Sequence, residues 1–154
     1  MNRHGICFKV IEMTDYFHAI IHAAPESTPE TAIIELDGQP LSTLRLSQLQ
    51  TRFEMSFEDV ADAFEALPRM FLEPDGSFVW VAGEGRGGFQ LDGLLVDDGV
   101  RLLTVEVKGQ ADQGGFEQFL RSLGWPGQSV VFQLVTHGIY LSESEFRKRF
   151  VTPE

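Results

Sequence analysis

The sequence predicts an α+β fold in which a mostly antiparallel sheet is packed by helices. Apolar residues recur at steps of three and four between Leu46 and Leu67, which is typical of an amphipathic helix. From Ser77 onward, short apolar runs alternate with turn residues, which is typical of strands. The predicted order is α-β-β-β-α-β-β-α from residue 47 onward, preceded by a β-α-β-β part. The 154 residues are expected to form a single domain with enough apolar material (43%) for a core.

The N-terminal part, residues 1–45, is predicted as a subregion of that domain. Residues 5–12 are predicted to form a strand, and residues 15–24 a short helix that Thr14 caps and Pro25 ends. Residues 25–30 contain two prolines and are predicted to be a linker. Asp37-Gly38 is a strong turn signal between two short strands.

The apolar stripe of residues 47–67 contains two capping-box patterns, one starting at Ser47 and one at Ser56. The segment is therefore predicted either as one helix that ends at Pro68 or as two helices that meet near Ser56.

The C-terminal half is predicted to contain three strands in residues 77–83, 89–96 and 101–107, followed by a helix in residues 115–123. A hairpin should form around His137-Gly138, and a capping box at Ser142 should begin a last helix that runs through Phe150. The basic residues 147–149 fall in its last turn, where cations interact favourably with the negative end of a helix.

Composition argues against several classes of protein. The net charge of −11 disfavours a nucleic-acid-binding protein, because Lys and Arg supply non-specific affinity for phosphates. A single cysteine, Cys7, excludes an intrachain disulfide and suggests a reducing compartment. The first thirteen residues are too short and too charged an apolar run for a signal peptide, and no run is long enough to span a membrane. We expect a cytoplasmic protein with no membrane partner.

Two groups of residues are candidates for metal binding. Asp15, His18 and His22 would share one face if residues 15–24 were helical, and carboxylate with imidazole suits a transition metal. Their surroundings are apolar, so this set is the less favoured one. Asp92, Glu106 and Lys108 lie on two predicted neighbouring strands, where the carboxylates could hold a divalent metal through oxygen.

The register of those two strands decides whether the second set converges. A two-residue turn at Asp98-Gly99 would pair Asp92 with Val105 and leave both faces mixed. A three-residue loop, residues 97–99, places apolar side chains on one face and Asp92, Glu106 and Lys108 on the other. We prefer the second register, because burial of one face fixes the register of a strand.

This arrangement of Asp92 and Glu106-Val107-Lys108 resembles the PD-(D/E)XK nuclease superfamily, whose core runs α-β-β-β-α-β. The resemblance covers residues 57–135. It implies that Asp92 and Glu106 bind Mg²⁺ or Mn²⁺, that Lys108 assists the attacking water, and that Gln118 is an accessory residue. Leu91 stands where the superfamily often has proline, no Gln-x-x-x-Tyr pattern follows, and no basic surface for nucleic acid is evident. Those departures leave room for an inactive relative.

The predicted element order is also similar to that of the type III secretion chaperone-like fold, whose members are dimeric and bind polypeptides. On this interpretation Glu106 and Lys108 are a solvated strand face, and the partner is a protein or a second copy of the chain. The leading hypothesis is a non-enzymatic, protein-binding domain of the chaperone or adaptor type. The metal-dependent nuclease is the alternative.

Overall fold

One antiparallel sheet organises the chain. The computed structural model describes residues 16–47, 49–82 and 89–153, and within them nine strands pair in the order β2-β3-β9-β8-β1-β7-β6-β5-β4. The strands are β1 (Phe17–Ala23), β2 (Thr31–Leu36), β3 (Gln39–Leu44), β4 (Met70–Leu72), β5 (Ser77–Ala82), β6 (Phe89–Asp97), β7 (Leu102–Gly109), β8 (Val130–Leu134) and β9 (Ile139–Ser142).

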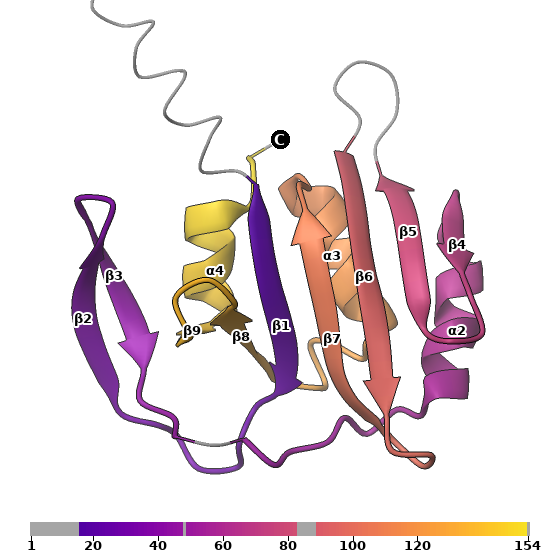
Figure 1. Ribbon diagram of the computed structural model, residues 1–154, viewed down its shortest axis with the longest axis horizontal. Coiled ribbons are helices and arrows are strands. Elements are labelled where there is room, and N and C mark those ends of the chain that lie inside the picture. The colour runs from indigo at the N-terminus through magenta and orange to yellow at the C-terminus, as the bar shows by residue number, and fades with distance from the viewer. Residues whose placement is uncertain (1–15, 48, 83–88, 154) are drawn as a thin grey trace, which may run out of the picture.

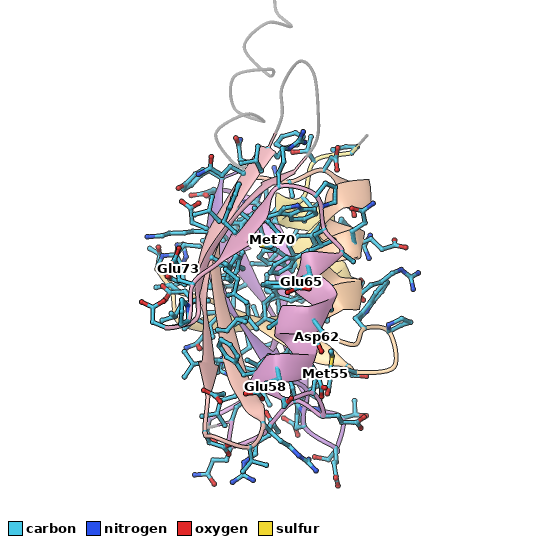
Figure 2. The ribbon with its side chains drawn as sticks, turned by 90° about the vertical axis from the view of Figure 1, so that its right-hand side faces the viewer. Met55, Glu58, Asp62, Glu65, Met70 and Glu73 are labelled. Carbon is cyan, nitrogen blue, oxygen red and sulfur yellow. The ribbon has the colours of Figure 1, made fainter. Side chains whose placement is uncertain are left out.

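Three helices in the described residues cover a single face of the sheet, so the fold has two layers (Figure 1). They are α2 (Phe57–Glu65), α3 (Gln113–Ser122) and α4 (Glu143–Phe150). Seen from the side, no helix lies on the opposite face (Figure 2). The core between the layers is rich in phenylalanine, and its largest fully buried side chains include Phe64, Phe78, Phe116, Phe119, Phe132 and Phe146.

The predicted α+β class and mostly antiparallel sheet are confirmed. The turn at Asp37-Gly38 joins β2 to β3, with positive φ angles of 53° and 78°, and Gly138 closes the β8–β9 hairpin with a φ of 69°. The strands predicted after residues 77, 89 and 101 are β5, β6 and β7. The predicted helices at residues 115–123 and after Ser142 are α3 and α4.

The predicted helix in residues 15–24 is wrong, because Phe17–Ala23 forms strand β1 in the middle of the sheet. Phe17, Ala19, Ile21 and Ala23 are buried, whereas the side chains between them are only half-buried. This period of two matches a strand that packs one face on a core. The predicted strand in residues 5–12 lies outside the described residues.

Both alternatives predicted for residues 47–67 are wrong in the first half, because residues 49–55 are not helical, whereas the predicted capping box at Ser56 is confirmed. Ser56 caps α2 through a complete capping box with Asp59. Before the cap, the chain is hydrogen-bonded to β7: the Phe53 N–H donates to Leu102 O at 2.9 Å, and the Leu102 N–H donates to Met55 O at 3.0 Å. Phe53 is apolar because it is fully buried in the core, not because it continues a helix.

The element order also differs from the predicted one. Strand β4, which was not predicted, follows α2 and forms the sheet edge beside β5. From residue 57 to residue 150 the order is therefore α-β-β-β-β-α-β-β-α. No helix in the described part of the chain is long and apolar enough to cross a membrane.

The basic residues 147–149 lie in the last turn of α4, as predicted. Two of them, Arg147 and Arg149, also donate hydrogen bonds to other elements. The Arg147 guanidinium donates to Glu143 at 2.9 Å, to Gln113 at 3.0 Å and to Glu117 at 3.4 Å, which ties α4 to α3. Of these three basic side chains, that of Lys148 alone is largely exposed, at 76%.

Candidate functional site on the uncovered face of the sheet

The sequence-predicted residues Asp92, Glu106 and Lys108 lie on the same face of the sheet, the one that no helix covers. Asp92 is on β6, and Glu106 and Lys108 are on β7. Their even-numbered neighbours share this face, whereas Leu91, Val105 and Val107 are fully buried on the helix side. The face assignment that the sequence predicted is therefore the one observed.

Both registers considered from the sequence are nevertheless wrong. Asp92 pairs with Lys108, four residues beyond the partner in the preferred register, and the register shifts between Val96 and Asp97. The connection is longer than a three-residue loop because Asp98 organises it: its Oδ1 accepts from the N–H groups of Val100 and Arg101 at 2.8 and 2.9 Å. A register shift by an even number of residues keeps every side chain on its face of the sheet. The predicted assignment of side chains to the two faces is therefore correct although the register is wrong.

Strand β1 brings a histidine to this site. His18 lies directly across from Lys108, and its Nε2–H donates to Oε2 of Glu106 over 2.6 Å. On the other side of β7, Gln90 Nε2 donates to Oδ1 of Asp92 at 2.9 Å. Both carboxylates are thus engaged by neighbouring side chains. We call the group of His18, Gln90, Asp92, Glu106 and Lys108 the central polar cluster.

A second histidine lies farther along β1. His22 Nε2–H donates to Gln133 Oε1 on β8 at 2.9 Å, and its ring lies 5.8 Å from that of Tyr140 on β9. Burial lowers the pKa of His22 below the ordinary value of 6.5, and the hydrogen bond to Gln133 offsets part of that shift. The imidazole of His22 is therefore held in its neutral form as a structural donor.

Neither predicted metal set is assembled in the part of the chain that the structure describes. His18 and His22 share the uncovered face of β1, but they bind different partners, and Asp15 lies outside the described residues. Gln118 lies exposed on α3, in the layer that covers the opposite face, so it is not brought to Asp92 and Glu106. Among residues 16–47, 49–82 and 89–153, no three His, Cys, Asp or Glu side chains are grouped closely enough to hold a metal ion.

Apolar side chains flank the central polar cluster on the same face. Glu106 lies between two apolar side chains, with Ile20 of β1 on one side and Leu94 of β6 on the other. Tyr140 of β9 and Leu44 of β3 lie farther along the same row of paired residues. At the two sheet edges, Phe71 and Ile33 are 62% and 70% exposed. The face is therefore mixed, with charge at its centre and apolar groups around it.

The sequence did not indicate His18 as the partner of Glu106, Gln90 as the partner of Asp92, or Gln133 as the partner of His22. The alternation of residues 17–23 was the available signal, since a strand would have placed His18, Ile20 and His22 on one face. Comparison of the chain with protein-family models, curated proteins and solved structures gives no match. The site is therefore interpreted from its own geometry.

Proposed function

We propose that this protein is a non-catalytic protein-binding domain, that its docking surface is the uncovered face of the sheet, and that the partner is a second copy of the chain. The observation that carries this proposal is the mixed character of that face. Apolar side chains surround a central polar cluster whose carboxylates already have hydrogen-bond partners. Such a surface suits docking better than it suits chemistry on a free carboxylate.

The face is large enough for a stable interface. Nine strands spaced by ~4.8 Å span about 40 Å, and the central strands extend over roughly 20 Å. The resulting area is on the order of 800 Å², which is about what each partner buries in a specific complex. Two such faces pack in the way that sheets pack in a β-sandwich.

The mixed charges of the uncovered face are compatible with a second copy as the occupant. The chain carries a net charge of −11, so identical copies repel over most of their surface. The outward side of α2 shows this, with Glu58, Asp62 and Glu65 in a row (Figure 2). The central polar cluster instead combines Asp92 and Glu106 with Lys108 and His18. A two-fold axis through this face can set the acids of one copy against the bases of the other.

The test is sedimentation equilibrium over a range of protein concentrations. We expect the wild type to be dimeric at micromolar concentrations. Leu94→Lys and Phe71→Lys place a charge on the face and should yield monomers, because a buried unpaired charge opposes association. Val100→Lys is the matched control: Val100 is 69% exposed in the turn between β6 and β7, so its replacement should leave the dimer intact. A monomeric wild type, or a dimer that Leu94→Lys does not weaken, would contradict the proposal.

A metal-dependent nuclease is the second candidate, and one observation favours it. Asp92, Glu106 and Lys108 share an accessible face, as the resemblance to the PD-(D/E)XK superfamily implies. For this function Glu106 would have to exchange its hydrogen bond with His18 for a metal ion.

A thermal melt with Mn²⁺ separates this candidate from the first. Saturation at a hundred times the dissociation constant stabilises the folded state by about 2.7 kcal/mol, or roughly 5 to 10 °C in Tm. Glu106→Ala should abolish that shift, and Glu73→Ala, which removes an exposed carboxylate from the loop after β4, should not. Calcium controls for diffuse binding to an acidic surface. A wild-type Tm that does not respond to Mn²⁺ would rule this candidate out.

A further inference from the structure

A cavity of about 420 Å³ opens where the β2–β3 hairpin separates from the rest of the sheet. Strand β3 pairs with β9 only at Leu44 and Tyr140, so the tip of its hairpin is free of β9. The cavity lies between Leu36 of that hairpin on one side and Leu134 of β8 on the other. Its volume falls within the roughly 300–1,000 Å³ typical of small-molecule sites.

Both apolar and polar side chains line this cavity, and Arg149 is its one permanently charged cation. The other polar side chains of the lining are those of Tyr16, His18, Asp37, Thr136 and His137. Phe17 and Leu134 are buried, Leu36 and Phe150 are half-buried, and all four side chains line the cavity. Arg149, at the end of α4, lies among them with a side chain that is only 15% exposed. A guanidinium in such surroundings has lost most of its water and requires other acceptors.

Within the described residues Arg149 finds few of those acceptors. Its Nη2 donates to the carbonyl of Leu36 at 3.3 Å, and the Nε is buried with no hydrogen-bond partner. The nearest carboxylate is that of Asp37, which is 3.9 Å from Nη2 and 76% exposed, so this ion pair is weak. Most of the five N–H donors of a guanidinium therefore remain unused.

We propose that this cavity binds a small monocarboxylate with an apolar body, and that Arg149 pairs with its carboxylate. The planar guanidinium matches a carboxylate with two parallel hydrogen bonds, and the apolar wall accepts the remainder of the ligand. A phosphate or a dianion fits less well, because Arg149 is the one permanently charged cation among the lining side chains. The ligand carboxylate takes the place that Asp37 now occupies at long range. This inference does not rest on the proposed function, because Arg149 is not part of the central polar cluster, although His18 of that cluster also lines the cavity.

The test is isothermal titration calorimetry of the full chain with octanoate and with 1-octanol, which has the same apolar body without the charge. We expect one octanoate per chain, bound at least about ten-fold more tightly than the alcohol. Arg149→Gln should remove that preference. Lys148→Gln makes the same change of charge one residue away on an exposed side chain, and should leave the affinity unchanged.

Asp37→Asn provides a test that does not risk the fold. Asp37 lies in a left-handed turn conformation that asparagine also adopts, and its side chain is exposed. Removing its charge frees Arg149, so octanoate should bind about two- to five-fold more tightly. Equal binding of octanoate and octanol, unchanged affinity in Arg149→Gln, weaker binding in Asp37→Asn, or no binding of octanoate would each overturn the proposal.

Discussion

Replacing Arg147 by methionine should destabilise the protein far more than the same replacement of its neighbour Lys148. The Arg147 side chain is 16% exposed and bonds to Glu143 at 2.9 Å, to Gln113 at 3.0 Å and, more weakly, to Glu117 at 3.4 Å. One bond to a carboxylate, one bond to a neutral amide oxygen and one long contact together contribute about 3 kcal/mol. Breaking a largely buried pair by removing one partner costs a similar amount. For a chain of this size the loss corresponds to a decrease of roughly 10 °C in Tm.

Urea denaturation of the two variants measures this difference. Lys148 is 76% exposed and contacts Glu145 at 3.4 Å, so Lys148→Met should cost less than about 0.5 kcal/mol. If residues 147–149 acted only through the helix dipole, the two variants would lose similar amounts, within ~1 kcal/mol. Comparable losses in both, or a loss below ~1 kcal/mol in Arg147→Met, would refute the assignment of this arginine as the link between α3 and α4.

Three further changes test the fold. Gly93→Ala should cost more than about 2 kcal/mol by thermal melt, because a Cβ there would overlap the Glu106 carbonyl and the Phe78 ring; wild-type stability would mean that β6 and β7 are spaced differently. Ser56→Ala removes the cap of α2 and should lower the unfolding free energy by about 1 kcal/mol in urea. His22 has a lowered pKa in the folded state, so the unfolded chain takes up its proton first and stability should fall as the pH drops below 6.5. His22→Gln should flatten that slope, and an unchanged slope would show that another group causes it.

The face on which Asp92, Glu106 and Lys108 lie could be predicted from the sequence, whereas their partners could not. Burial of one face requires only that side chains alternate between the two faces of the strand. The predicted assignment of side chains to those faces is therefore correct, although the predicted register was wrong by four residues. The partner of Glu106 is His18, 88 residues away, and no local pattern indicates a contact at that distance. The register itself depended on Asp98 hydrogen bonds that lengthen the β6–β7 connection.

The two wrong helices have a common physical cause. In residues 17–23 the apolar positions fit a period of two as well as a helical period, and tertiary pairing with β7 and β8 selected the strand. Before Ser56, the apolar spacing reflects Phe53 entering the core from an irregular segment. In both places burial had set the apolar pattern, and backbone hydrogen bonds to distant strands decided the conformation.

The central position of β1 has a consequence for the synthesis of this protein. The strand emerges from the ribosome before every strand that flanks it, and the His22–Gln133 contact spans 111 positions. At about 5–20 residues per second, β1 waits roughly 5 to 20 s for β8 to be translated. Until β7 is translated, neither strand that flanks β1 exists, and until β8 is translated β1 can pair on one side only. The yield of folded protein therefore depends on protecting this nascent segment from aggregation until the C-terminal strands appear.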